Sequence, residues 1–251
     1  MNNRTLLKVG GAELEDGPEI EALADALSRL IAERQMVVVH GGGPEIARLQ
    51  ERLGLKPNFI DGLRVTDQES LRVAEMVLSG AVNKRLTARL VTRGAKAIGM
   101  SGIDCGLLRA AKVQHPKGDL GCVGEIVEVQ TAPLLELLSL GYTPVISPIS
   151  LGADGRPLNV NADHAALAIA RALQVQEAIF LTNVPGVLVD GQVMAELSSE
   201  HAQQLIEAGH ITGGMIPKVQ SALQVIACGV QAVRITNLEG LAQASGTRVS
   251  A

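Results

Sequence analysis

Apolar runs of strand length alternate with amphipathic segments of helix length along most of this 251-residue chain. Residues 36–39 (MVVV) and 178–181 (AIFL) are apolar without interruption, whereas residues 18–35 repeat apolar side chains at helical spacing. Uninterrupted apolar strands are typical of parallel sheets that helices cover on both faces, because neither face of such a sheet meets water. The alternation therefore predicts an α/β fold.

The same alternation continues towards the C-terminal end of the chain. The pattern predicts strands at residues 5–9, 36–39, 144–147, 178–181 and 232–235. It predicts helices at residues 18–35, 134–140, 164–173, 198–208 and 215–228, and a further helix that opens at residues 44–46. Residues 107–130 differ, because scattered β-branched residues and glycines favour one or two hairpins that project from the sheet. No linker-like stretch interrupts the pattern, so we place a lobe boundary within the folded body, at residues 171–176.

The composition excludes several other classes of protein. Hydrophobic residues make up 47% of the chain, which supports a sizeable core and argues against disorder. The formal net charge of −4 and the aromatic content of 1% leave neither a basic face nor a stacking platform for nucleic acid. No run of 18 apolar residues occurs, so we expect no transmembrane helix and no membrane partner.

The cysteines and histidines do not follow the pattern of a metal site or a disulfide framework. Cys105, Cys122 and Cys228 are odd in number and widely spaced, and the five histidines show no ligand spacing. We therefore expect free thiols and no metal ion bound by protein side chains. The first residues lack the apolar core and cleavage site of a secretory signal, so we expect a cytoplasmic protein.

Glycines gather after two of the predicted strands. Gly10-Gly11 follows the first strand, which carries Lys8 near its end, and residues 41–43 (GGG) follow the second strand and precede a helix. Ligands of open parallel sheets bind beyond the carboxyl ends of the strands, where glycines expose main-chain N–H groups to an anion. Tight turns are the alternative explanation, but two such clusters with a lysine favour an anion site. Neither cluster has the spacing of a P-loop or of a dinucleotide-binding fingerprint.

Two later segments place polar residues where an anionic ligand would need them. Arg64 stands between a glycine and a Thr-Asp helix cap, where it is suited to paired hydrogen bonds with a carboxylate, although a surface ion pair explains it equally well. Asn159 and Asn161 lie two residues apart in an extended segment and therefore face the same way. Asp163 opens the next helix, either as its cap or as an acid that orients cations.

A lysine lies in the first turn of a late helix. Gly213-Gly214 precedes that helix, and Lys218 follows within its first residues. The N-terminal end of a helix is electropositive, so a lysine there opposes the helix dipole. The placement becomes consistent if an anion binds between the two, and Lys218 is therefore a candidate ligand of an anion.

Taken in order, these segments resemble the amino acid kinase family. The resemblance covers nearly the whole chain and rests on LLKVGG, VVVHGGGP, DGLRVTD, AVNK, PVISP, LNVNAD, LTNVPGV and GGMIPK, in the order that the family shows. It implies a three-layer α/β/α sandwich with two lobes and an open, mostly parallel central sheet of about eight strands. Residues 1–173 would bind the acid substrate and form a homodimer, and residues 174–251 would bind ATP.

The resemblance also implies a reaction and a set of site residues. ATP would phosphorylate the side-chain carboxylate of N-acetyl-L-glutamate to give N-acetyl-L-glutamyl 5-phosphate, in the second step of arginine biosynthesis. Lys8 and Lys218 would flank the transferring phosphoryl group, and Asp163 would hold both ammonium groups. The substrate and phosphoryl oxygens would contact Gly11, Gly42, Gly43, Arg64, Asn159 and Asn161. The nucleotide would contact Gly10, Asn183, Gly186, Val187, Leu188, His210, Thr212 and Gly214, and its phosphates would hold Mg²⁺.

The charges of the reactants agree with this set of residues. A carboxylate nucleophile with an ordinary pKa near 4.3 is already ionised at pH 7, so it needs no general base. The reaction needs instead a cancellation of the repulsion between two anions. Lysines, Mg²⁺, glycine N–H groups and helix N-termini supply that cancellation.

The chain departs from the family pattern at two places. Asn183 stands where the family often has Asp, which removes a negative charge near the nucleotide. Only seven residues precede Lys8, whereas hexameric members that arginine inhibits carry an additional N-terminal helix. We therefore expect an arginine-insensitive homodimer.

Two alternative functions fit the same fold. One is a kinase for aminoadipate or glutamate linked to a carrier protein, although the HGGGP and FIDGLRVTD segments are of the type that binds free acetylglutamate. The other is a non-catalytic sensor of arginine or nucleotide. A sensor does not need two lysines together with Asp163, so the sequence favours the kinase.

Overall fold

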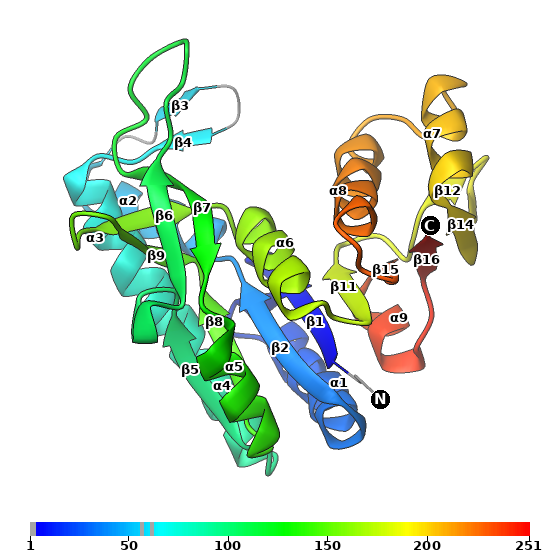
Figure 1. The fold of residues 1–251 in the computed structure, drawn as a ribbon, viewed down its shortest axis with the longest axis horizontal. Coiled ribbons are helices and arrows are strands. Elements are labelled where there is room, and N and C mark those ends of the chain that lie inside the picture. The colour runs from blue at the N-terminus through cyan, green and yellow to red at the C-terminus, as the bar shows by residue number, and fades with distance from the viewer. Residues whose placement is uncertain (1–3, 56–57, 61–62) are drawn as a thin grey trace.

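The computed structural model describes residues 4–55, 58–60 and 63–251. Its centre is an eight-stranded sheet with the strand order β14-β16-β15-β11-β1-β2-β8-β5 (Figure 1). In that order the strands are β14 (Glu196–Ser198), β16 (Thr247–Ser250), β15 (Ala232–Thr236), β11 (Glu177–Leu181), β1 (Arg4–Val9), β2 (Gln35–His40), β8 (Thr143–Ser147) and β5 (Ala97–Ser101). The six strands from β15 to β5 are parallel, and β16 runs antiparallel to β15. The predicted open, mostly parallel sheet is confirmed.

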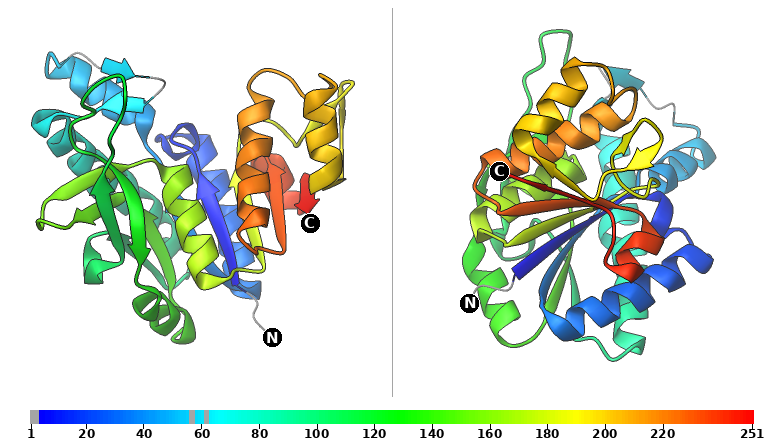
Figure 2. Two further views of the ribbon diagram at one scale, coloured as in Figure 1. Left: turned by 45° about the horizontal axis from the view of Figure 1, so that its top comes forward. Right: turned by 90° about the vertical axis from the view of Figure 1, so that its right-hand side faces the viewer.

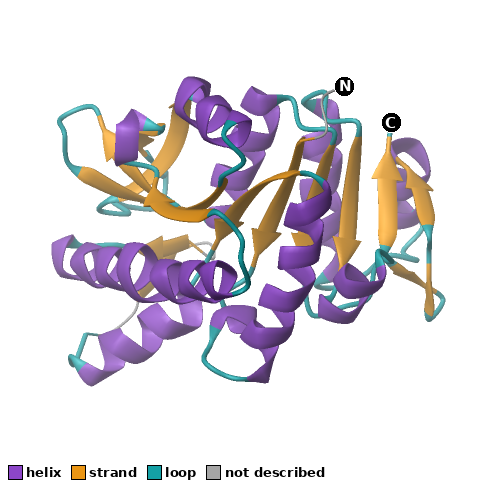
Figure 3. Ribbon diagram, turned by 90° about the horizontal axis from the view of Figure 1, so that it is seen from below, coloured by secondary structure: helices purple, strands orange, loops and turns teal. Residues whose placement is uncertain are grey.

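Helices cover both faces of this sheet (Figures 2 and 3). One layer contains α1 (Pro18–Glu33), α3 (Gln68–Glu75), α4 (Asn83–Thr92) and α9 (Leu238–Gln243). The other contains α5 (Thr131–Ser139), α6 (Ala162–Leu173), α7 (Ser199–Glu207) and α8 (Met215–Ala227). Successive residues of β1 serve the two layers in turn, since Leu6 packs into the core with α6 and Leu7 into the core with α1. The fold is therefore the predicted three-layer sandwich.

Further elements that follow β1 and β2 lie outside the large sheet. The 3₁₀ turn η1 (Ala12–Leu14) follows β1, helix α2 (Gly43–Arg52) follows β2, and the π-helix η2 (Met76–Val82) joins α3 to α4. A second sheet contains β6 (Leu108–Lys112), β7 (Val123–Val129), β9 (Ile149–Gly152) and β10 (Pro157–Val160), and it closes on itself through the pairing of β9 with β10. The β6–β7 hairpin confirms the hairpin predicted within residues 107–130.

Small elements complete the chain. They are the hairpins β3 (Asn58–Ile60) with β4 (Leu63–Val65) and β12 (Leu188–Val189) with β13 (Gln192–Val193), and the 3₁₀ turn η3 (Asp104–Gly106). Cys105, Cys122 and Cys228 are free thiols, as predicted. Within the residues described, every helix is too short or too polar to span a bilayer.

Candidate active site

Lys8 lies at the carboxyl end of β1, in the middle of the large sheet. Strands β2 and β11 flank β1 on either side, so the lysine is held between the two halves of the molecule. Its Nζ lies 2.9 Å from Oδ1 of Asp163, and only 17% of its side chain is exposed. Asp163 belongs to the first turn of α6, and its own N–H donates to Oδ1 of the N-cap residue Asn161 at 2.7 Å. The cap therefore fixes the acid that holds the lysine.

The two glycine turns lie against each other because β1 and β2 are adjacent and parallel. Gly41 donates its N–H to the carbonyl of Val9 at 3.0 Å, which ties the second turn to the end of the first strand. A Cβ on Gly11 would lie 2.7 Å from Cδ of Pro44 and 2.9 Å from Cα of Gly42. Only a residue without a side chain permits this approach, and it brings the N–H groups of both turns to one place.

A cavity of about 310 Å³ lies directly over these turns. Helix α2 points its N-terminal end at this cavity, and its N-cap, Gly42, offers no side chain to occupy the N–H groups of the first turn. Those N–H groups and the dipole of the helix favour an anion. The cavity is lined by glycines of both turns and by four polar side chains: Gly10, Gly11, Gly41, Gly42 and Gly43, with Lys8, Asn159, Asn161 and Asp163.

The structure thus brings together five of the six residues that were predicted to bind the acid substrate. The sixth, Arg64, lies on β4 opposite Phe59, and its side chain is outside the part of the chain that the structure describes. Asn159 donates from Nδ2 to Oγ1 of Thr66, two residues beyond Arg64, at 3.3 Å. The segment that carries the arginine is therefore connected to the cavity wall.

A second cavity, of about 470 Å³, begins where the first ends. Both cavities are lined by Lys8 and Asp163, together with Gly10 and Gly11. The second extends to Asn183 and Lys218 in the C-terminal part of the chain. The lysine pair therefore lies along one continuous path, with Lys8 at the junction of the two cavities.

The structure gives the two lysines different partners. Asp163 contacts Lys8, whereas Nζ of Lys218 donates to Oδ1 of Asn183 at 3.2 Å. The family resemblance implied that Asp163 holds both ammonium groups, and the contacts described here join it to Lys8 only. The partner of Lys218 is instead Asn183, the position at which the chain departs from the family pattern.

Of the residues predicted to bind the nucleotide, Gly10 and Asn183 line the second cavity and the other six do not. Val187 is buried, and both its N–H and its carbonyl are engaged, with Oγ1 of Thr247 at 2.7 Å and with the N–H of Met194 at 3.0 Å. Nδ1 of His210 lies 3.4 Å from a carboxylate oxygen of Asp190. The remaining four are Gly186, in the loop before β12, Leu188, the first residue of β12, and Thr212 and Gly214, in the segment before α8.

A buried histidine supports the second glycine turn from below. His40 is fully buried, with Nδ1 2.9 Å from the carbonyl of Gly41 and Nε2 3.0 Å from Nδ2 of Asn83. A carbonyl can only accept, so the proton lies on Nδ1 and Nε2 accepts from the amide. Burial lowers the pKa of His40 from its ordinary value of 6.5 to about 4. The ring is therefore neutral at pH 7.

Asn83 connects that histidine to two further strands. Its Nδ2 also lies 2.9 Å from the carbonyl of Val145 on β8 and 3.2 Å from the carbonyl of Met100 on β5, so three acceptors share its two protons. The sequence offered one signal for this residue, the AVNK segment, but its role depends on partners 17 to 62 residues away. Among the residues described, no group of three or more His, Cys, Asp and Glu side chains is placed to hold a metal ion.

Comparisons with known proteins agree with this geometry. A profile described as the amino acid kinase family matches residues 3–237. An acetylglutamate kinase of Roseiflexus sp. (strain RS-1) is 53% identical over 237 residues, which are 94% of this chain and 89% of that protein. One of Chloroflexus aurantiacus (strain J-10-fl) is 48% identical over 249 residues, 99% of this chain and 97% of that protein.

Solved structures show the same fold. The structure of smu.665 from Streptococcus mutans is 30% identical, with a TM-score of 0.82 over 100% of this chain and 99% of that one. An N-acetylglutamate synthase from Neisseria gonorrhoeae, complexed with coenzyme A and N-acetylglutamate, is 27% identical, with a TM-score of 0.86 over 99% of this chain and 59% of that one. The chain belongs to the amino acid kinase family.

Proposed function

We propose that this protein transfers the γ-phosphoryl group of ATP to the side-chain carboxylate of N-acetyl-L-glutamate, a step of arginine biosynthesis. A carboxylate oxygen forms the new bond to the γ-phosphorus, the bond from that phosphorus to the β,γ-bridging oxygen breaks, and ADP leaves with the electron pair. The relatives named acetylglutamate kinase support this activity. The observation that carries it is the position of Lys8 where two cavities meet, each lined by anion-binding groups.

The two cavities divide the substrates between two lobes. The first cavity belongs to residues 1–173, and we assign it to acetylglutamate, with Asn159, Asn161 and the side chain of Arg64 as ligands. The second reaches into residues 174–251, and we assign it to the phosphates of ATP. The phosphoryl group then crosses from one cavity to the other at Lys8.

The residues of this chain act by charge. The nucleophile is ionised at neutral pH, so no side chain has to remove a proton. Lys8 stabilises the charge on the transferring phosphoryl group, Asp163 keeps its ammonium group in place, and the N–H groups of Gly11 and Gly43 bind the phosphoryl oxygens. Lys218 binds the leaving β-phosphate after it exchanges Asn183 for the nucleotide.

Mg²⁺ fits this site as a companion of the phosphates. The side chains around the second cavity combine two lysines with the separate acids Glu13 and Asp163, which is not a ligand set for a resident ion. The phosphates therefore hold the ion, and when bound it supplies further neutralisation of charge. The adenosine end would extend over Leu188, His210 and Thr212.

We further propose a cytoplasmic homodimer. The edge strand β5 has a strand partner, β8, on one side only within the described residues, and Ile98 on that strand is exposed. Unpaired sheet edges are surfaces on which chains associate. Sedimentation equilibrium of the purified protein should give twice the chain mass of 26.2 kDa, and a monomer or a hexamer would contradict this assignment.

A hydroxamate assay tests the substrate. Hydroxylamine traps acyl phosphates, so the purified protein with ATP and Mg²⁺ should give product with N-acetyl-L-glutamate and much less with glutamate or aminoadipate. The Lys8→Met variant is the control for contaminating kinases. Binding of nucleotide without any product would instead support the sensor, and the names of the relatives do not favour the carrier-linked alternative.

A further inference from the structure

Arg85 joins three separate segments of the N-terminal lobe through one guanidinium group. It lies on α4 with 15% of its side chain exposed. Its Nη1 donates to the carbonyl of Leu14 at 2.8 Å, and Nη1 and Nη2 donate to the two carboxylate oxygens of Glu45 at 2.8 and 3.0 Å. Its Nε lies 3.3 Å from Oδ2 of Asp16. The planar fork of an arginine can make all these contacts at once, and a lysine cannot.

Two of these partners stand directly after the two glycine turns. Leu14 ends η1, the turn that begins immediately after Gly11. Glu45 lies in the first turn of α2, the helix that begins at Gly43. The guanidinium therefore sets the separation of the two segments whose N–H groups face the first cavity.

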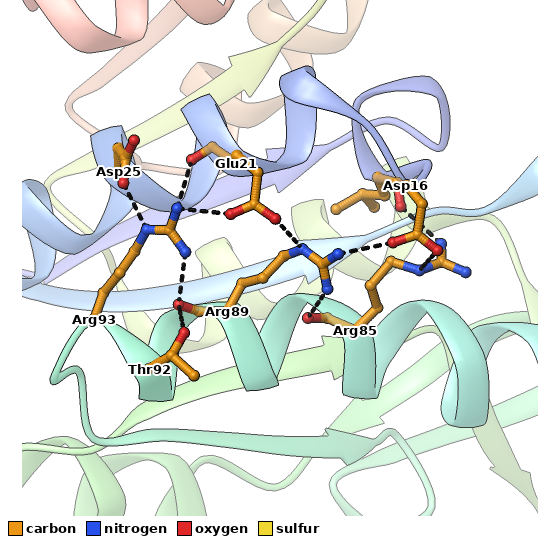
Figure 4. Close-up of polar contacts among 8 residues, drawn as sticks. Asp16, Glu21, Asp25, Arg85, Arg89, Thr92 and Arg93 are labelled. Carbon is orange, nitrogen blue, oxygen red and sulfur yellow. Dashed lines mark hydrogen bonds and ion pairs between the residues drawn. The ribbon is translucent and has the colours of Figure 1, made fainter.

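The neighbouring arginines Arg89 and Arg93 make different contacts from those of Arg85. Figure 4 shows Arg85 and Arg89 of α4 and Arg93 at its C-cap in a row, opposite acids from α1 and the loop before it. Arg93 pairs with Asp25 at 2.6 Å and with Glu21 at 2.8 Å. Those acids are about half exposed, and surface pairs of this kind contribute little stability. Arg89 shares Asp16 with Arg85, at 2.8 Å, but within the described residues only Arg85 of the three contacts Leu14 and Glu45.

The ion pair with Glu45 is intact at neutral pH. Hydrogen bonds from Arg85 hold the pKa of the Glu45 carboxyl below its ordinary value, and the carboxylate raises the pKa of Arg85. Glu45 is itself 21% exposed, which places the pair between the surface and the core. A bidentate pair in that position fixes direction as well as distance.

We infer that Arg85 is a positioning residue for phosphoryl transfer, which fixes Leu14 and Glu45 and thereby the spacing between the N–H groups of Gly11 and Gly43. The inference rests on the proposed function, because that function assigns the two N–H groups to the phosphoryl oxygens. Groups that bind a transition state lose effect steeply when they are displaced. Loss of Arg85 therefore affects the chemical step more than the binding of either substrate.

The first test compares Arg85→Ala with Arg93→Ala. Arg93 is a matched control because it is the C-cap residue of the same helix, is 22% exposed and pairs with two acids. We expect kcat of R85A to fall on the order of 10²-fold, with much smaller changes in the KM of either substrate, and R93A to keep the kcat of the wild type. An unchanged kcat in R85A, or equal losses in both variants, would overturn the inference.

Chemical rescue separates positioning from misfolding. A cavity of about 490 Å³ borders Arg85, Glu45 and Asp16, so a guanidinium ion can enter the space that R85A leaves. Millimolar guanidinium should restore part of the kcat of R85A, whereas methylammonium at equal ionic strength should not. If R85A does not fold, Glu45→Gln serves as the second variant and should lower kcat in the same direction. Equal effects of the two cations on R85A, or a normal kcat in E45Q, would contradict the inference.

Hydrogen exchange tests the same inference without turnover. In R85A the amides of residues 10–14 and 42–46 should exchange faster, whereas in R93A the increase should stay within residues 21–25 and 89–93. If the wild type makes no acyl phosphate, the proposed function fails, yet the exchange pattern still decides whether Arg85 holds the turns. Unchanged exchange of both segments in R85A would refute the positioning role.

Discussion

At the residue scale, the proposed chemistry depends on how Lys8 is held. Lys8 is largely buried, is paired with Asp163 and lies at the junction of the two cavities. An ammonium group held in this way needs no reorganisation as negative charge develops on the transferring group. Lys218 lies at the far end of the path and is bound to a neutral amide, so a nucleotide phosphate can replace that partner.

Removal of either amine should slow the chemical step. We expect Lys8→Met and Lys218→Ala to lower kcat by about 10²–10³-fold, with a much smaller rise in the KM for acetylglutamate, because such contacts strengthen in the transition state. Steady-state kinetics measure both parameters. Lys96→Met is the control, since Lys96 lies over the ring of Tyr142, away from both cavities. An unchanged kcat in either site variant would contradict its assignment.

We expect a different effect at Arg64, because this residue would bind acetylglutamate already in the ground state. We expect Arg64→Lys to raise the KM for acetylglutamate and to leave the KM for ATP near its original value, since lysine lacks the planar fork that matches a carboxylate. The same steady-state assay, with each substrate varied in turn, measures the split. A change confined to the KM for ATP would show that the arginine serves the other cavity.

The buried His40 should make stability depend on pH. Its folded pKa of about 4 lies below its ordinary value of 6.5, so between these values the unfolded chain binds a proton that the folded chain does not. The contribution of His40 to the free energy of unfolding is therefore fully present above about pH 6.5. It falls as the pH is lowered towards 4, by up to about 1.4 kcal/mol per pH unit. Urea unfolding of His40→Gln should lack this slope, and His201→Gln, on the exposed side of α7, should keep it.

At the scale of elements, the site depends on how closely two turns approach. The turn after β1 touches the turn after β2 through Gly11, whereas a Cβ on Gly43 would meet nothing within 4 Å. The two glycines border the same cavity but have different structural requirements. The π-helix η2 contributes Leu78 to the apolar part of the lining of that cavity.

A pair of glycine substitutions tests this contact. Gly11→Ala should lower the free energy of unfolding by about 1–3 kcal/mol, because its Cβ would overlap main-chain atoms of the second turn. Gly43→Ala should keep the stability of the wild type. Denaturant midpoints at constant slope measure the difference, and equal midpoints for the two variants would contradict the close approach.

At the scale of the whole molecule, the two lobes share one sheet. Strand β1 pairs with β11 along four residues, and a single apolar core includes Leu6 and Val37 together with Val219 and Val233. The boundary proposed near residue 173 therefore crosses a continuous core, although the proposed function assigns the two substrates to opposite sides of it. Such a connection favours cooperative unfolding.

Calorimetry tests that continuity. We expect a single unfolding transition. A non-hydrolysable ATP analogue with Mg²⁺ should move the whole transition to higher temperature, because at a concentration 100 times its Kd it raises the free energy of unfolding by about 2.7 kcal/mol. Without nucleotide, the Lys218→Ala variant should unfold at the same temperature as the wild type. The nucleotide analogue should raise its unfolding temperature by less. Two separate transitions, only one of which responds to the nucleotide, would show that the lobes unfold independently.

The repeating elements could be predicted from sequence because they depend on local patterns. Residues 178–181 and 215–228 were predicted as a strand and a helix, and the structure has β11 at Glu177–Leu181 and α8 at Met215–Ala227. Strands and helices each bury apolar residues at a characteristic spacing, and that spacing can be recognised from residues close together in the sequence. The glycine turns and Lys8 could also be placed at one sheet edge, since parallel strands end on the same side.

Other features were decided only by packing between distant segments. The sequence did not predict β5, the hairpins β3–β4 and β12–β13, or the π-helix η2, whose patterns are short or resemble an ordinary helix. Asn83 lies 43 residues from His40, and Leu14 and Glu45 lie 71 and 40 residues from Arg85. No local pattern specifies which distant carbonyl, amide or carboxylate a buried polar group will meet. The periodicity of the sequence determines which helices and strands form, whereas the three-dimensional packing of the layers determines which buried polar groups contact one another.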